Sequence, residues 1–158
     1  DNYNMKLEEL KKNYAILEKK YKLPSFTKLN EEFGIEVLRK GEELLLRNIR
    51  KIMLEKIVNS LGFVEMLLNP VNAPRMYFIY LKSVSAEDKK DLDKIYSVLS
   101  DIVLGSSRLE IEYSEKGEAT MISRIVKDWD SIKPDFVKII EHMQNPVSSP
   151  TKERSYFG

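Results

Sequence analysis

The sequence contains no cysteine, one histidine and only six glycines. Without cysteine the chain has no disulfide, no thiolate nucleophile and no cysteine ligand for zinc or an iron–sulfur cluster. The glycines are scattered singly and none is followed by Lys-Ser or Lys-Thr, so neither nucleotide-binding fingerprint is present. No nucleophile elbow supports a serine hydrolase triad. We therefore expect no enzyme activity, no catalytic residues, no cofactor and no bound metal.

The only histidine, His142, follows Glu141 near the end of a helical pattern. A histidine at such a position most often caps the helix or interacts with its dipole at the surface. Ferritin-like di-iron sites need two Glu-x-x-His pairs, and Ile139 stands where the glutamate of such a pair would be. The sequence excludes that chemistry.

Long hydrophobic runs and a strong net charge are also missing. A membrane-spanning helix needs about 20 apolar residues, and the longest runs here, such as residues 76–81, are much shorter. The first residues are charged and lack the apolar segment of a secretory signal, so we expect a cytoplasmic protein without membrane contact. The formal net charge of +1 argues against a protein built mainly to coat nucleic acid.

The composition suits one folded domain. The 158 residues are enough for a single core, which we place in residues 1–146, followed by a polar tail over residues 147–158. Lysine and glutamate are abundant and Gln144 is the only glutamine, which is typical of thermophilic proteins, although an AT-rich genome also favours lysine codons. Met5 is a candidate native start, in which case residues 1–4 are additions.

Apolar residues recur at a spacing of three or four along most of the chain, which is the helical period. The first helix runs from Leu7 to Tyr21 and ends before Pro24. A short second helix follows, capped by Ser25 or Thr27 and stopped by Gly34. The pattern predicts an all-α, single-domain bundle of about five or six helices.

Residues 35–68 carry the widest apolar arc and are expected to form a long central helix covered on more than one side. Gly41 and Gly62 each either lower the stability of this helix or interrupt it, and a kink is expected at Gly62 rather than at Gly41. The last helix spans about residues 117–144, with a kink or a break expected at Pro134.

Two intermediate segments are more ambiguous. Asn72 is a candidate N-cap for the run at residues 76–81, which fits a helix better than a buried strand. Ser85 is expected to start the next helix, and acidic residues follow it in the first turn. Residues 109–113 alternate apolar and acidic side chains, so residues 108–114 form either an extended connector, which we favour, or a continuing helix.

A basic face on the central helix is a candidate contact for phosphate groups. Residues 39–56 hold an excess of three positive charges. One interpretation is an outer face that forms salt bridges with an acidic neighbour such as residues 87–101. The other is nucleic-acid binding by the candidate phosphate-contacting residues Arg39, Arg47, Arg50 and Lys51.

The aromatic segment at residues 69–81 is the candidate protein interface. As core, its large side chains would each contribute roughly 1.5–3 kcal/mol on burial. As surface, the combination of tyrosine, methionine and arginine matches the composition of interaction hot spots. The residues that would form this interface are Arg75, Met76, Tyr77 and Tyr80.

Several short motifs are distinctive. They are Leu23-Pro24-Ser25-Phe26 with Leu29-Asn30 and Phe33, Leu68-Asn69-Pro70 with Asn72-Ala73-Pro74, and Tyr113 with Glu115-Lys116. Over about residues 5–144 they make the chain resemble an uncharacterised, mainly archaeal family of small helical proteins. That family has no known activity, so the resemblance implies a cytoplasmic archaeal origin and assigns no functional residues.

Taken together, the sequence favours a non-catalytic interaction or scaffold protein that binds a protein partner or associates with itself. The alternative is a nucleic-acid-associated protein that uses the basic face of the central helix.

Overall fold

The computed structural model describes residues 2–38 and 44–145. Within these ranges the chain is helical throughout its regular structure, so the predicted all-α class is confirmed. The predicted tail at residues 147–158, Gly41 and Arg39 lie outside the described residues. The elements are α1 (Asn2–Tyr21), α2 (Phe26–Phe33), the 3-10 helix η1 (Ile35–Leu38), α3 (Leu45–Leu68), the 3-10 helix η2 (Pro70–Asn72), α4 (Arg75–Leu81), α5 (Ala86–Ile111) and α6 (Glu115–Gln144).

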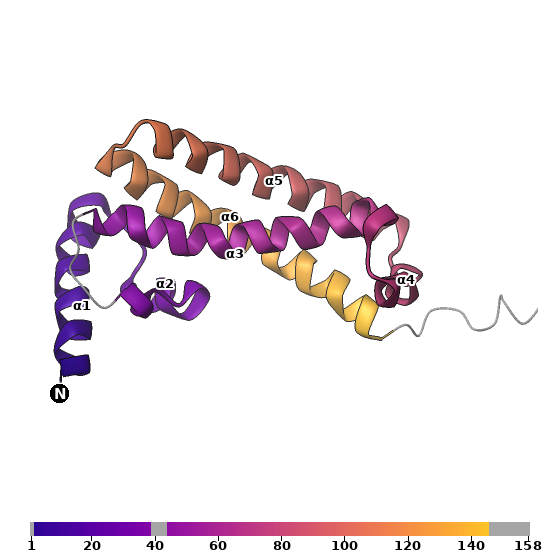
Figure 1. The fold of residues 1–158 in the computed structure, drawn as a ribbon, viewed down its shortest axis with the longest axis horizontal. Helices are drawn as coiled ribbons and strands as arrows, with labels where there is room; N and C mark the ends of the chain where they lie inside the picture. The colour runs from indigo at the N-terminus through magenta and orange to yellow at the C-terminus, as the bar shows by residue number, and fades with distance from the viewer. Residues whose placement is uncertain (1, 39–43, 146–158) are drawn as a thin grey trace, which may run out of the picture.

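Three long helices, α3, α5 and α6, form an elongated bundle (Figure 1). The helices α3 and α6 run in the same direction and α5 runs against both, because only a few residues connect α5 to α6. The remaining helices cover the two ends of the bundle. Helices α1 and α2 lie where α3 begins, and α4 lies where α3 and α6 end. None of the described helices has the length and apolar character that crossing a membrane requires.

Local capping signals fix several helix ends. The Ser25 hydroxyl accepts a hydrogen bond from the Lys28 amide, and Gly34 ends α2 at a φ of 65°. At the start of α5, Ser85 and Asp88 form a capping box, in which each side chain bonds the other residue's amide. These caps confirm the predicted starts and stops because they act within one helical turn.

A single apolar core runs along the inner faces of the three long helices. Each helix contributes a stripe at the predicted spacing, which buries its side chains almost completely. The stripes include Ile49, Met53 and Ile57 of α3, Leu92, Ile95, Leu99 and Ile102 of α5, and Ile122, Ile125, Trp129 and Ile132 of α6.

Trp129 anchors α2 to the bundle. Its Nε1 donates to Glu32 Oε2 at 3.2 Å, and its ring lies 6.4 Å from that of Phe33, centroid to centroid. The Lys56 ammonium lies 5.1 Å from the Trp129 ring centroid and donates to the Glu32 carbonyl oxygen at 2.5 Å. Aromatic and cationic contacts of this kind hold a helix too short to be stable alone.

The predicted helix over residues 35–68 is wrong in its first part. Ile35 opens the 3-10 helix η1, and α3 begins only at Leu45. Leu44 has a φ of 63°, in the left-handed region, which interrupts a right-handed helix at that point. From Leu45 the helix is continuous, and it runs through Gly62 without a break.

The extended connector favoured for residues 108–114 is also wrong over most of its length. Helix α5 continues to Ile111, and only residues 112–114 connect it to α6. A single strand here would have no partner for its backbone groups, whereas the helix satisfies them internally. The apolar and acidic alternation arises because Glu110 turns toward α3 while Ile111 faces outward.

Two further expectations need correction. Asn72 does not cap α4, because it ends η2 and Pro74 takes the position before the helix. Ala73 is extended at a ψ of 142°, as expected for a residue that precedes proline. Helix α6 begins at Glu115 and continues through Pro134, which rules out the break among the two alternatives expected there. Proline has no amide hydrogen for the Asp130 carbonyl, and Asp130 is exposed. The run at residues 76–81 is helical, which rules out the strand interpretation.

Candidate functional site

The basic side chains of α3 converge on one carboxylate of α5. Arg47 Nη2 and Arg50 Nη2 each donate to a different oxygen of Glu110 at 2.6 Å. Lys51 Nζ lies 4.0 Å from the same carboxylate. The hydrogen bonds from Arg50 and Arg47 lower the pKa of Glu110 to about 2. Arg47 also lies over the Tyr113 ring, with 6.0 Å between its guanidinium carbon and the centroid.

A second carboxylate holds Arg50 inside the bundle. Arg50 donates through Nε and Nη2 to Glu118 of α6, and both side chains are fully buried. Burial by itself lowers the pKa of Arg50, but the bonds to Glu118 and Glu110 outweigh it and raise that pKa. Arg50 therefore joins α3 to both α5 and α6.

These contacts show where the predicted phosphate-contacting residues lie. Arg50 has no exposed surface, so the expectation that it lies on an outer face is wrong. Arg47 is partly buried and paired with Glu110, while Lys51 remains exposed. The salt-bridge interpretation named residues 87–101 as the acidic neighbour. The neighbouring helix is indeed α5, but the acid is Glu110, and Glu118 of α6 adds a second one.

The sequence does contain a signal for the buried pair. Glu118 continues the apolar stripe of α6, four residues before Ile122, and Arg50 occupies a similar place on α3 between Leu46 and Met53. A charged residue on an apolar stripe indicates a buried ion pair, because an unpaired buried charge is strongly unfavourable. The sequence could not show that these two residues face each other.

A contact between a histidine and a carboxylate joins two helices at the other end of the bundle. His142 Nδ1 lies 2.9 Å from Asp88 Oδ2, and the same oxygen accepts a bond from the Ser85 amide at 3.0 Å. Burial raises the pKa of Asp88, but the bonds from Ser85 and His142 outweigh it and lower that pKa. His142 thus holds the end of α6 against the start of α5, a contact that the sequence did not predict.

The aromatic segment lies at the surface rather than in the core. None of the side chains of α4 is fully buried. Tyr77 and Tyr80 are half-buried, and the Tyr77 ring packs edge-on against Phe63 at 6.3 Å between centroids. Arg75 and Met76 are exposed. Of the four predicted interface residues, the two tyrosines hold α4 to the bundle and the other two face outward.

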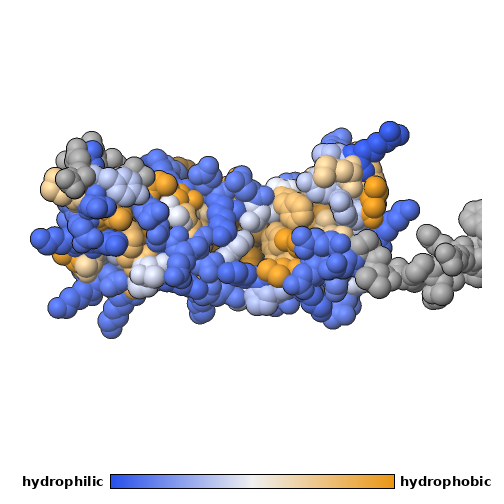
Figure 2. Space-filling model, turned by 90° about the horizontal axis from the view of Figure 1, so that it is seen from below, coloured by the Kyte–Doolittle hydropathy of each residue, from blue (hydrophilic) through white to orange (hydrophobic). Residues whose placement is uncertain are grey.

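Other apolar side chains extend this exposed region. Val71 in η2 and Phe78 and Ile79 in α4 are exposed, and Figure 2 shows hydrophobic surface over the end of the molecule where α4 lies. Residues 69–86 contain no acidic residue, and their only charges are Arg75 and Lys82. We call the following side chains the α4 surface: Val71, Arg75, Met76, Phe78, Ile79 and Lys82.

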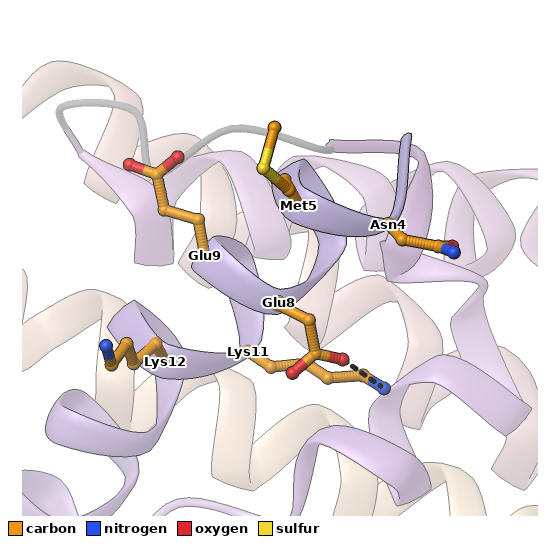
Figure 3. A pocket seen from close by; sticks show the side chains of 6 residues that line it. All are labelled: Asn4, Met5, Glu8, Glu9, Lys11 and Lys12. Atoms are coloured by element: carbon orange, nitrogen blue, oxygen red, sulfur yellow. Dashed lines mark ion pairs between the residues drawn. The ribbon is translucent and has the colours of Figure 1, made fainter. Parts of the chain in front are cut away.

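A depression along α1 does not form a binding site. Figure 3 shows the side chains that line it, and Glu8 and Lys11 form an ion pair 3.9 Å long on one side while Glu9 and Lys12 point to the other. These side chains come from one helix and do not converge on a common point. Over residues 2–38 and 44–145, no three acidic or imidazole side chains gather where they could hold a metal ion.

Comparisons of the chain with models of protein families, with curated proteins and with solved structures find no match. The resemblance to an archaeal family therefore stays a prediction.

Proposed function

We propose that the protein is a cytoplasmic, non-catalytic helical interaction protein that associates with itself through the α4 surface. The observation that carries this proposal is the exposure of Met76, Phe78 and Ile79 beside Val71, four large apolar side chains within nine residues. Contiguous exposed apolar surface on a folded domain marks an interaction site more often than chance, whereas isolated apolar side chains need no explanation.

The core does not require this arrangement. The half-buried Tyr77, Tyr80 and Leu81 already pack α4 against the bundle, and they lie on the side of the helix opposite to the exposed residues. The outward face could therefore be polar without loss to the fold. An exposed Ile79 contributes nothing to the isolated molecule, but it would contribute roughly 1–2 kcal/mol when covered by a partner.

The basic face of α3 gives less support to the nucleic-acid alternative. Arg47 and Arg50 are bound to Glu110 and Glu118, so these two arginines could contact a phosphate only if it replaced these carboxylates. Arg50 would in addition have to leave the interior of the bundle. The interaction hypothesis needs no such rearrangement.

Light scattering on a gel-filtration column tests the proposal with two matched variants of the full chain. Ile79→Ser alters the α4 surface at a side chain that is 66% exposed, and Ile16→Ser alters α1 at one that is 67% exposed. We expect the wild type and Ile16→Ser to gain mass with rising concentration and Ile79→Ser to stay monomeric. A wild type that remains monomeric at about 1 mM would refute the proposal.

A further inference from the structure

A second exposed apolar surface lies on the outer side of α5 and α6. It is an open groove of about 730 Å³, and its apolar wall is formed by Leu104, 72% exposed, and Ile111, 84% exposed. A Cβ at Gly105 would lie 2.5 Å from Met121 Cε, so a side chain at this position would require the end of Met121 to shift. We call the following residues the α5–α6 groove: Asp101, Leu104, Gly105, Ser107, Arg108, Ile111, Glu112 and Arg124.

The groove offers acidic groups beside its apolar wall. Asp101 lies one helical turn before Leu104 and has no ion-pair partner in the described part of the chain. Glu112 follows Ile111 and pairs with Arg108 at 3.8 Å, but both of these side chains are highly exposed, so the pair is weak and easily exchanged. Arg124 forms an ion pair with Asp128, with 3.4 Å between Nε and Oδ2.

The α4 surface carries only positive charges, whereas the groove holds two acids, Asp101 and Glu112, beside two arginines that already form ion pairs. Arg75 and Lys82 flank its apolar side chains, and neither has an ion-pair partner among the described residues. A symmetric contact between two α4 surfaces would bring four cations together with no acid from residues 69–86 to offset them. A contact between an α4 surface and a groove would instead place these cations near Asp101 and Glu112.

We propose that the α4 surface of one copy docks into the α5–α6 groove of a second copy, with Met76 and Ile79 against Leu104 and Ile111. This inference rests on the proposed self-association and names the surface that receives α4. The two surfaces lie at opposite ends of the bundle, because α4 precedes the start of α5 and the groove is near its end (Figure 1).

Such a head-to-tail contact has a consequence for assembly. Each copy that uses its α4 surface still presents a groove. The contact therefore either closes as a two-fold dimer, in which each copy docks its α4 surface into the other's groove, or repeats into a ring or an open series of copies. A contact built on a helix of seven residues is small, so we expect it to be weak and strongly dependent on concentration.

Sedimentation velocity on three isoleucine-to-serine variants of the full chain tests the proposal. Ile79→Ser removes an anchor from the α4 surface, Ile111→Ser removes one from the groove, and Ile16→Ser is the control on α1. All three side chains are exposed, so we expect the far-ultraviolet circular dichroism and the thermal unfolding of the variants to match the wild type. The first two variants should each weaken association about tenfold or more, and the control should not.

The decisive sample is an equimolar mixture of Ile79→Ser and Ile111→Ser. Its only unaltered contact joins the α4 surface of the Ile111→Ser chain to the groove of the Ile79→Ser chain. We therefore expect dimers of one chain of each kind, formed with the affinity of a single unaltered contact and growing no further.

Other results would separate the two proposals. If Ile111→Ser associates like the wild type while Ile79→Ser does not, the groove is not the receiving surface, and the proposed function stands without this inference. If Ile79→Ser has no effect, or if Ile16→Ser weakens association equally, both proposals are refuted.

Discussion

Replacing Arg50 by methionine should be among the most damaging single changes in this protein. Methionine has a similar length and suits the apolar surroundings, but it leaves the Glu118 carboxylate without its partner. Within the described residues, Arg50 is the only group that bonds this buried carboxylate. Removal of one member of a buried ion pair typically costs about 3–5 kcal/mol, because the other charge stays in the interior uncompensated. That loss is a large part of the roughly 5–15 kcal/mol that stabilises an average domain.

A double variant separates the cost of an unpaired charge from the value of the pair. In Arg50→Met/Glu118→Met both charges are gone and the space remains filled. Arg50 Nη1 is buried and has no hydrogen-bond partner among the described residues, so the natural network is not fully satisfied. We therefore expect the free energy of unfolding of the double variant to lie within about 1 kcal/mol of the wild-type value, or above that value.

Urea denaturation followed by tryptophan fluorescence measures these differences, since Trp129 is the only tryptophan and is buried. Arg47→Met is the matched control, because Arg47 binds Glu110 but its side chain is partly exposed. It should cost about 1 kcal/mol or less. A loss below about 1 kcal/mol for Arg50→Met would contradict the buried-charge argument. A double variant as unstable as the single one would show that the pair itself stabilises the fold.

Three further predictions concern local features. Gly62→Ala should raise the free energy of unfolding by about 0.5–1 kcal/mol, because nothing outside the adjoining backbone of its own helix lies within 4 Å of the added Cβ. Gly34→Ala should lower it by about 1 kcal/mol, because Gly34 has a φ of 65°. Denaturation curves that shift the free energy of unfolding of both variants in the same direction would contradict this. The pKa of Glu110 is lowered from 4.5 to about 2, so its charge stabilises the fold above pH 4.5 and this contribution is lost as the pH falls through about 2. Glu110→Gln should therefore be less stable than the wild type at neutral pH, and an acid titration should show this difference disappear toward pH 2. A difference that stays constant with pH would contradict the prediction. Ser85→Ala should cost about 1 kcal/mol in thermal unfolding by breaking the capping box with Asp88, and an unchanged melting temperature would show that the box is not needed.

Most of the secondary structure was predictable because its causes are local. Ser25 and Gly34 bound α2, Ser85 starts α5, and Asn145 follows α6, all within the reach of one helical turn. The errors occurred where a local pattern had two solutions. Residues 109–113 alternate like a strand, but the helix places Glu110 where Arg47 of α3 can bind it. That partner is 63 residues away in the sequence.

The candidate sites depended on contacts between distant segments. Arg50 was predicted on an outer face because its charge suggested exposure, yet Glu118, 68 residues away, pairs with it inside the bundle. For α4 the apolar run indicated either core or interface. Only the docking of Tyr77 and Tyr80 against the bundle showed which side of the helix remained outside.

The sequence alone therefore determined the all-α class, the stripes of the three long helices and the caps that start or end them, because hydrogen bonding and helical periodicity act over a few residues. The tertiary structure alone decided that Arg50 is buried, that Glu110 and Glu118 are its partners, and that Met76 and Ile79 face outward. Burial is a property of the surface that two elements share, and no single segment can specify it.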